Sequence, residues 1–570
     1  MWKKIENYYW TLKYLKKSQW FYLMKNRMER GKKAVTEVQA PQSRPLSLWM
    51  QGLDEAPEYL RRFQVEEILK GKVTLLYESG RPEGENWEHA DRSHLWNFNL
   101  HYLEFLIPLA AAYRRERDLR YYECFQDYCI RWMEDNRKGT GDGWHPYTIS
   151  LRLTSLWICM DGFGDVIQKD PEFLQKLNNS MYAQYLHLQK RMERHLLGNH
   201  YLENLKTVLL GARYFQEPKV YHRVKKRFAE EIKEQILPDG VHYERSMMYH
   251  KIILEDLMRV EKVLEGRSEP PQGSGETVHP SGLVKVIQRM ADAAYSLEEG
   301  MGHTLLFNDA GDNVARPLTA ILDALYEEFH IRPRYRQAFA RSGYYILRNE
   351  DLKLVFDAGE IAPACMPGHA HCDGLSFELS WKGGPLFVNS GTGQYQGPLR
   401  TYFRSTAAHN TVVIEGEEQS VCWGEHRVGK RMKMVSASHK EHWAEGSLMT
   451  AAGRLQVRRL ELEENSVVIR DYVNGRAAGY LHLAPGYVYI PQKDCVLVQD
   501  GKGQKIGKIH VMPEDIVRVH KEGTICSCAP EFGKTEPASV LEILWDGDGT
   551  EHETRIQFHL FMGKNAEEDI

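Results

Sequence analysis

The sequence lacks the features that mark several protein classes. Its nine cysteines are an odd number without a Cys-x-x-Cys pair, which favours reduced thiols over a disulfide framework. Neither common Gly-rich phosphate-binding motif is present, so nothing supports a nucleotide site and we expect no organic cofactor. The N-terminus has no apolar core followed by a cleavage site, and no run approaches the roughly 20 apolar residues of a membrane span. We therefore expect a cytoplasmic protein.

A strong charge of either sign is also missing. The 570 residues include 74 Lys or Arg and 78 Asp or Glu, which gives a formal net charge of -4. Nothing in this overall balance favours a nucleic acid or an acidic membrane as partner, so an anionic ligand would have to be bound by a local cluster of cations. The 13 Trp and 30 Tyr supply flat amphipathic rings, which both sugar-binding clefts and large cores use.

The first residues, MWKKIENYYWTLKYLKKSQWFYLMKNRMERGKK, are rich in aromatic and basic side chains. Their spacing allows an amphipathic helix that lies on a membrane, on a partner or on the chain's own domain. We favour packing on the chain's own domain. We assign residues 1–90 to this arm and its lead-in, and the sequence does not indicate an oligomeric state.

The length predicts two or three domains. Residues 91–340 contain helical apolar patterns such as LENLKTVLLGARYF, joined by short polar turns, which is typical of helical hairpins packed in an arc or toroid. Residues 341–570 change to short alternating runs such as NTVVIEGEEQ, which indicate an antiparallel β-sandwich. The polar stretch at residues 272–282 is either a lid or a connection.

The stretch MPGHAHCDGLSFELSW places His369, His371 and Asp373 just before an alternating run. That run predicts a half-buried strand beginning near Leu375. The three titratable side chains would share one side if the strand conformation extends back to them. A loop with exposed histidines is the alternative.

Two other stretches combine ionisable residues with helical spacing. In GNHYLEN, one helical face could aim Asn199, His200 and Glu203 at a cleft, although a capping amide with a surface pair is an equal alternative. In HYERSMMYH, Arg245 precedes Tyr249 by about one helical turn and would favour the phenolate. A tyrosine in the core is the alternative there.

Taken in order, HLWNFNLHYLEFL, GNHYLEN, ERSMMYH, PGHAHCDGLSFEL, VNSGTGQY and RSTAAHNTVVI resemble the heparinase II/III-like polysaccharide lyases, which include relatives acting on alginate. The resemblance covers residues 90–415. It implies an α+β multidomain fold, an incomplete (α/α) toroid followed by an antiparallel β-sandwich, with the active cleft between them. The implied reaction is β-elimination at a uronic acid, in which a base removes the C5 proton and the glycosidic oxygen on C4 leaves.

The resemblance also implies roles for individual residues. Asn199 and His200 would neutralise the uronate carboxylate, because the developing negative charge must be stabilised by preorganised donors. Tyr249 would be the general base or acid, and His369 its partner across the domain interface. Glu203 would orient His200.

A structural metal site is implied as well. Its ligands would be His371, Asn389 and His409, and two neutral imidazoles suit zinc. Relatives commonly have Asp where this chain has Asn389, a departure that weakens the site unless Asp373 compensates. A hydrogen-bonded polar cluster is the alternative to an occupied metal site.

The favoured substrate is an acidic polysaccharide, a glycosaminoglycan such as heparan sulfate before alginate. Arg152 and Arg404 are cations that could bind its carboxylate or sulfate groups, unless they are simply solvated. One alternative is a noncatalytic sugar-binding or assembly protein of bacterial exopolysaccharide or capsule biosynthesis. A glycoside hydrolase needs two carboxylates across the scissile bond; Asp309 and Asp312 are candidates, but they are close in sequence and more simply brace a loop.

Overall fold

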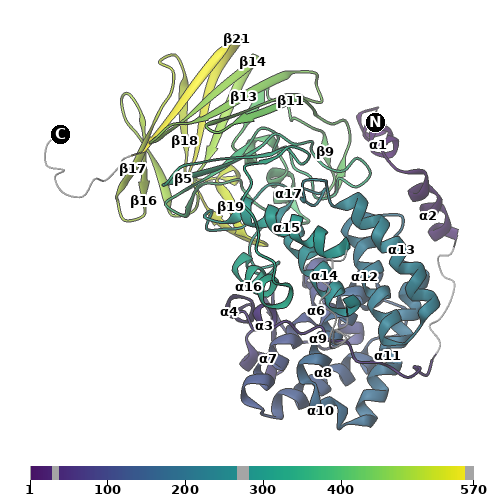
Figure 1. Ribbon diagram of the computed structural model, residues 1–570. Helices are drawn as coiled ribbons and strands as arrows, with labels where there is room; N and C mark the ends of the chain where they lie inside the picture. Colours follow the sequence, from purple (N-terminus) through teal and green to yellow (C-terminus); the bar gives the residue numbers. More distant parts are fainter. Residues whose placement is uncertain (1, 29–36, 266–281, 559–570) are drawn as a thin grey trace, which may run out of the picture.

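A computed structural model describes residues 2–28, 37–265 and 282–558. The helical part of the chain lies at the lower right of Figure 1 and the strand-rich part at the upper left. The predicted lid or connection at residues 272–282 lies outside the described residues except for its last glycine.

The helical part is built from long helices joined by short turns. Several helices begin with proline, whose fixed φ suits the first helical position and whose missing N–H is not needed there. The helices before the first large sheet are α1 (Trp2–Lys13), α2 (Lys17–Met28), α3 (Gln51–Asp54), α4 (Pro57–Arg61), α5 (Val65–Leu69), α6 (His94–Tyr102), α7 (Ile107–Glu116), α8 (Arg120–Asp135), α9 (Pro146–Phe163), α10 (Asp165–Gln168), α11 (Pro171–Arg191), α12 (Gly198–Tyr214), α13 (Pro218–Gln235), α14 (Met247–Glu265), α15 (Gly282–Glu298) and α16 (Leu318–Phe329).

Burial separates inner helices from outer ones. Nearly every residue of α9 and α12 is buried, so these helices are surrounded by protein. Helix α13 instead buries one stripe, Val224, Phe228 and Ile232, at a spacing of four residues. Such a stripe belongs to a helix with one face on the core and one in solvent. The pattern follows from the sequence, since α13 is rich in Lys, Arg and Glu outside the stripe.

The strand-rich part contains two large antiparallel sheets within the described residues. The first has the order β3-β4-β5-β6-β7, with β3 (Ala338–Phe339), β4 (Tyr344–Arg348), β5 (Leu352–Asp357), β6 (Phe377–Trp381) and β7 (Gly384–Phe387). The second contains β8 (Val412–Ile414), β11 (Lys433–Lys440), β12 (Trp443–Met449), β13 (Leu455–Leu462), β14 (Ser466–His482), β15 (Tyr487–Pro491), β16 (Val496–Asp500), β17 (Lys505–His510), β18 (Ile516–His520) and β21 (Val540–Phe558). Short elements complete this part, namely α17 (Pro398–Phe403) and the paired strands β9 (Cys422–Trp423) with β10 (Arg427–Val428) and β19 (Ser527–Glu531) with β20 (Lys534–Pro537). One further pair, β1 (Val73–Leu75) with β2 (Glu78–Gly80), belongs to the helical part, between α5 and α6.

The first sheet lies between the helices and the second sheet. Alternate residues of its strands point to opposite faces: Leu347 and Leu354 pack toward the second sheet, whereas Ile346 and Val355 join the core of the helical part. The half-buried strand predicted for β6 is therefore wrong, because four of its five residues are buried. The strand begins only at Phe377, so the preceding histidines lie in a loop.

An ion pair joins the two parts through β6. His303 Nε2 lies 2.7 Å from Glu378 Oε2, and both side chains are buried. Burial alone would lower the pKa of His303, but the charge of Glu378, with a smaller contribution from Asp312, raises it to about 9. Because the folded pKa exceeds the ordinary value near 6.5, the pair stabilises the fold fully below that pH and loses the contribution as pH rises through 9.

We expect the stability that His303 supplies to fall by about 3 kcal/mol between pH 6.5 and pH 9. Melting temperatures of the wild type and of His303→Gln, measured across this range, check it. The two curves should converge as pH rises. A difference that stays constant would show that His303 does not titrate in this window.

The N-terminal arm packs against both parts of the chain. Thr11 Oγ1 donates to the carbonyl of Val428 in the strand-rich part. Gln19 Nε2 donates to the carbonyl of Cys365 in the strand-rich part and to that of His195 in the helical part. The predicted packing of the arm on its own chain is confirmed. None of the helices in the described ranges combines the length and apolar character that a membrane crossing needs.

Candidate active site

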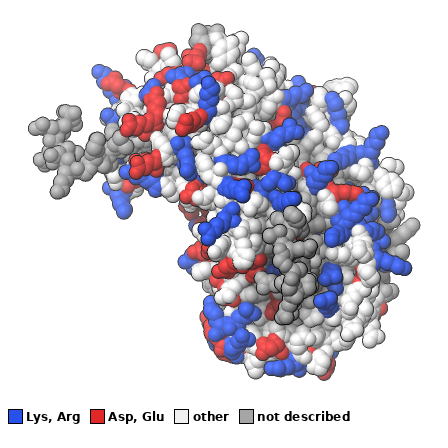
Figure 2. Space-filling model, in the orientation of Figure 1, with Lys and Arg blue, Asp and Glu red and all other residues white. Residues whose placement is uncertain are grey.

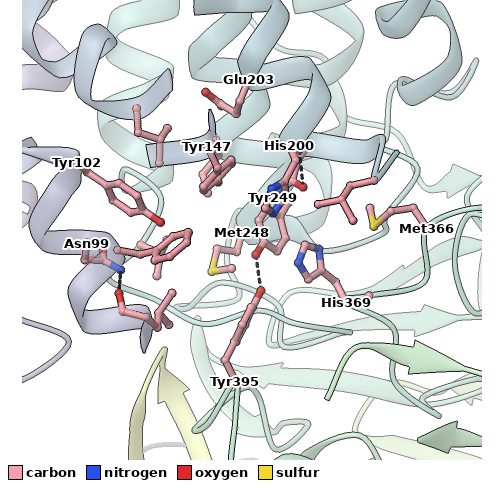
Figure 3. A pocket seen from close by; sticks show the side chains of 18 of the residues that line it. Asn99, Tyr102, Tyr147, His200, Glu203, Met248, Tyr249, Met366, His369 and Tyr395 are labelled. Carbon is pink, nitrogen blue, oxygen red and sulfur yellow. Dashed lines mark hydrogen bonds between the residues drawn. The ribbon is translucent and has the colours of Figure 1, made fainter. Parts of the chain in front are cut away.

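A cavity of about 630 Å³ lies where the helical part meets the loops of the sheets. Helices α6, α9, α12 and α14 line one side, and the loops carrying His369, Tyr395 and His426 line the other. Asn199, His200, Tyr249 and His369, the four predicted catalytic residues, all line this cavity. Figure 3 shows the ring of His369 beside that of Tyr249, with His200 close by.

The start of α12 places Asn199 in the cavity wall. Gly198 has a φ of 64°, and a Cβ there would lie 2.4 Å from the side chain of Met366. Only glycine therefore allows the chain to turn into the helix so close to the loop of the sheet. The N–H of Asn199 donates to Glu244, and its Oδ1 accepts the N–H of His200. Within the described part of the chain its Nδ2 group donates no hydrogen bond, which leaves a donor for a ligand.

Glu193, which the sequence did not point to, orients His200. Its Oε1 lies 3.0 Å from His200 Nδ1, and the ring of Tyr147 stacks on the imidazole at 4.2 Å between centroids. Burial works against the charged imidazole, but the carboxylate of Glu193 more than offsets it and raises the pKa of His200. This arrangement favours a cation in the cavity wall.

The role predicted for Glu203 needs correction. Its carboxylate lies 2.6 Å from Lys206 Nζ, which also binds Asp256, so it belongs to a charged cluster and does not hydrogen-bond to His200. It does line the cavity, and in Figure 3 it lies away from the imidazole.

We expect Glu193→Gln to lower the pKa of the His200 imidazole, because the neutral amide removes the charge that raises it. Titration of the ring by NMR measures this directly. A Glu203→Gln variant is the comparison, and it should leave the pKa of His200 closer to that of the wild type. An unchanged pKa in Glu193→Gln would contradict the assignment.

Tyr249 on α14 is held from two sides. Its hydroxyl hydrogen-bonds to that of Tyr395, and its ring stacks on His369 at 4.3 Å with an 11° interplanar angle. Burial, followed by the nearby Tyr395 and Asp309, raises the pKa of Tyr249 well above 10.

The expectation that Arg245 favours the phenolate is wrong. Arg245 precedes the helix, and its Nε donates to the carbonyl of Ser342 instead.

Glu244 connects His369 to the helical part. Its Oε2 lies 2.5 Å from His369 Nδ1, while its Oε1 accepts the N–H of Asn199. Burial would raise the pKa of Glu244, but His369 and His242 lower it below its ordinary value, so the group is an anion. In a neutral imidazole, donation of Nδ1–H to this carboxylate places the lone pair of His369 on Nε2.

Both predicted substrate-binding arginines are structural. Arg152 is fully buried and donates to Gln184 Oε1 and to the carbonyls of His101 and Gly143. Arg404 is buried and donates to backbone carbonyls of the sheet loops, including that of Ala370. Sequence spacing could not show this, since burial arises from distant segments. Arg427, which is exposed and lines the cavity, is the cation that sequence reasoning missed.

The two aspartates considered for hydrolysis do not flank the cavity. Asp309 is completely buried and paired with Arg400 and His371. Asp312 accepts hydrogen bonds from Thr304. Both brace loops.

Two family models match almost the whole chain. The model described as heparinase II/III N-terminus matches residues 56–331, and the one described as heparinase II/III-like, C-terminal, matches residues 331–559. The chain belongs to the heparinase II/III-like family.

Curated relatives and solved structures agree with the family. The chain is 23% identical over 498 residues to a heparin-sulfate lyase of Bacteroides thetaiotaomicron, covering 79% of this chain and 66% of the relative. It is 22% identical over 367 residues to a heparin-sulfate lyase of Pedobacter heparinus, covering 59% and 54%. The chain thus spans about half to two thirds of the length of these relatives.

A crystal structure of heparinase III superposes with a TM-score of 0.69 at 17% identity, covering 95% of this chain and 91% of that one. A heparan sulfate lyase mutant from Pedobacter heparinus gives 0.59 at 16% identity, covering 95% and 87%. These likenesses confirm the predicted fold, a helical toroid followed by a β-sandwich.

The metal ligands implied by the heparinase II/III-like resemblance form a buried cluster. His371 Nε2 lies 2.8 Å from Asp309, and the rings of His371 and His409 are 5.3 Å apart. His371 Nδ1 and both ring nitrogens of His409 are buried without a hydrogen-bond partner among the described residues. Burial lowers the pKa of His371 to about 4 and that of His409 well below its ordinary value, so both rings are neutral.

These histidines fit a metal ion, because zinc binds neutral imidazole. In such sites a carboxylate often holds the ring nitrogen that does not bind the metal. The third position fits less well. Asn389 Oδ1 accepts from Ser376 and Asn410, and Asp373 accepts the N–H of Asn308 rather than joining the cluster. No group of three or more His, Cys, Asp or Glu in the described ranges is arranged to hold a metal ion.

Proposed function

We propose that the protein is a polysaccharide lyase that cleaves a uronate-containing glycosaminoglycan, of the heparan sulfate type, by β-elimination. The observation that carries the proposal is the convergence of Asn199, His200, Tyr249 and His369 from both parts of the chain on one cavity. The names of the curated relatives supply the substrate class.

The acid and base roles follow from the hydrogen bonds. Tyr249 is neutral because its pKa is raised, so it donates its proton to the leaving oxygen on C4. His369, held by Glu244 through Nδ1, takes the C5 proton on Nε2. The electron pair of the C5–H bond then forms the C4=C5 double bond as the C4–O bond breaks. The products are an unsaturated uronate and a new reducing end.

Asn199 and His200 stabilise the charge that develops on the uronate carboxylate. The free Nδ2 group of Asn199 is a neutral donor, and Glu193 favours the cationic form of His200. Such preorganised donors stabilise the developing charge more strongly in a cavity than donors in water do, because they do not have to reorganise during the reaction. Aromatic rings of Tyr102, Tyr147 and Phe98 line the same cavity and provide apolar faces for sugar rings.

A panel of polymers tests the proposal. Heparan sulfate, heparin, chondroitin sulfate and alginate are each incubated with the protein, and the ultraviolet absorbance of the conjugated uronate is followed. We expect a rise with heparan sulfate that exceeds the rise with alginate. Faster reaction with alginate would assign an alginate-type lyase. Binding of a polymer without any rise would support the noncatalytic sugar-binding role.

We also propose that His371 and His409, with Asn389, hold one structural divalent metal ion, zinc in preference to others. The unpartnered ring nitrogens support this. When bound, the metal would fix the loop that contains His371 and thereby the position of His369, two residues earlier.

Elemental analysis of protein purified without chelator tests the metal. We expect about one zinc per chain and a lower melting temperature after chelation, because a metal that binds only the folded state stabilises it. His371→Ala should abolish both effects, whereas His520→Ala, an exchange on β18, should preserve them. Metal-free protein with an unshifted melting temperature would leave a hydrogen-bonded cluster as the better account.

A further inference from the structure

The outer face of the N-terminal arm is apolar and exposed. Ten of the eighteen large hydrophobic side chains exposed in the described part of the chain lie in residues 2–28. They follow helical spacing, with one row along α1 and another along α2. These rows are Trp2, Ile5, Tyr9 and Leu12, then Trp20, Phe21, Met24 and Met28, and the most exposed is Trp2 at 85%. Monomeric proteins rarely leave so continuous an apolar face in water.

The opposite face of the arm is already occupied. Thr11 on α1, Leu15 between the two helices and Gln19 on α2 line the active-site cavity. The arm is fixed there by hydrogen bonds from Gln19 to Cys365 and from Trp423 to Thr11. The outer rows therefore cannot turn inward without breaking these contacts.

The arm is also strongly basic. Residues 2–28 contain seven Lys or Arg and one Glu, although the whole chain has a formal charge of -4. Lys4, Lys13, Lys17 and Arg27 are exposed beside the apolar rows. Helix α13 adds the exposed Lys225, Lys226 and Arg227, and Figure 2 shows blue side chains crowded where Figure 1 places α13.

We propose that the arm docks the protein on an anionic lipid bilayer, with α1 and α2 lying in the plane of the interface. Trp and Tyr suit the headgroup region, Ile5, Met24 and Met28 suit the acyl boundary, and the flanking cations match anionic headgroups. A second copy fits poorly, because two such basic faces repel each other. An acidic polysaccharide fits poorly too, because methionine and isoleucine offer nothing to sulfate or hydroxyl groups.

Docking would place the cavity beside the membrane. The same two helices carry the lipid-facing rows and the cavity-lining residues, so the substrate chain would be bound close to the bilayer surface. The inference concerns the arm alone and does not depend on the proposed lyase activity.

Sedimentation with vesicles tests the docking. The full chain is mixed, without polysaccharide, with vesicles of phosphatidylcholine alone or of phosphatidylcholine with phosphatidylglycerol. We expect at least about tenfold more protein bound to the anionic vesicles, and weaker binding at high salt. The triple exchange Trp2→Ser, Phe21→Ser and Met24→Ser should lose about tenfold or more of this binding.

The control exchanges two exposed apolar residues of the sheets, Val435→Ser and Ile516→Ser, and it should bind vesicles like the wild type. All variants should keep the wild-type circular dichroism spectrum, since every changed side chain is exposed. Equal binding by the triple variant, or none by the wild type, would overturn the proposal. Two other results would overturn it if the wild type does not bind vesicles. One is a dimer that the triple variant abolishes, and the other is retention on immobilised heparan sulfate that depends on these residues.

Discussion

The exchange Tyr249→Phe should lower kcat on heparan sulfate by about 10²- to 10⁴-fold, the range expected when a general acid is lost. The ring that stacks on His369 stays in place, so KM changes little. Only the hydroxyl that bonds to Tyr395, and that we propose as the donor to the leaving oxygen, is removed. Steady-state kinetics that follow the unsaturated product measure the loss.

A matched control separates chemistry from folding. Tyr128 also has a buried hydroxyl, which donates to the carbonyl of Ile68 in the helical core, away from the cavity. Tyr128→Phe should therefore keep wild-type kcat while costing a similar amount of stability. Turnover by Tyr249→Phe within a few-fold of the wild type would refute the role of this phenol.

Asn199→Ala should lower kcat/KM by about 10²- to 10³-fold, as the loss of one preorganised donor does elsewhere. His369→Ala should have an effect of similar size, because it removes the proposed base. The two residues belong to different parts of the chain but are linked through Glu244. Their combined loss should be less than the product of the single losses if they act on one transition state.

Asn178→Ala is the control for the amide. Asn178 is buried and accepts a hydrogen bond from Tyr214, but it does not line the cavity. This exchange should change the melting temperature and leave kcat/KM intact. Independent, multiplicative losses for Asn199→Ala and His369→Ala would contradict a shared site.

The fold could be predicted because its periodicities are local. The helical spacing of apolar residues in residues 91–340 and their alternation after residue 341 can be seen among neighbouring residues. Each pattern arises because one face of a helix or strand packs against the core. The burial of β6 was missed for the opposite reason. Its second face is covered by the turn and loop that follow α15, where Gly300 and His303 bind Ser380 and Glu378, and no pattern within the strand reveals this.

The site could be predicted only where its residues stand in motifs. Tyr395 and Glu244 lie in stretches that the sequence singled out, VNSGTGQY and HYERSMMYH, so their titratable side chains were available as a signal. Glu193 had no such signal, because only the fold brings it to His200. Arg152 was misassigned because an arginine buried on carbonyls looks like any other in sequence.

Mass spectrometry of the products from heparan sulfate tests the central claim, that this cavity performs β-elimination. If the cavity performs β-elimination, we expect products that are lighter by one water than those of hydrolysis and that carry the conjugated double bond at the non-reducing end. These products should form at least about a hundredfold more slowly with Tyr249→Phe, and at the wild-type rate with Tyr128→Phe. Saturated products that have gained a water would contradict β-elimination in this cavity. So would an intact polymer recovered after incubation with the folded wild-type protein.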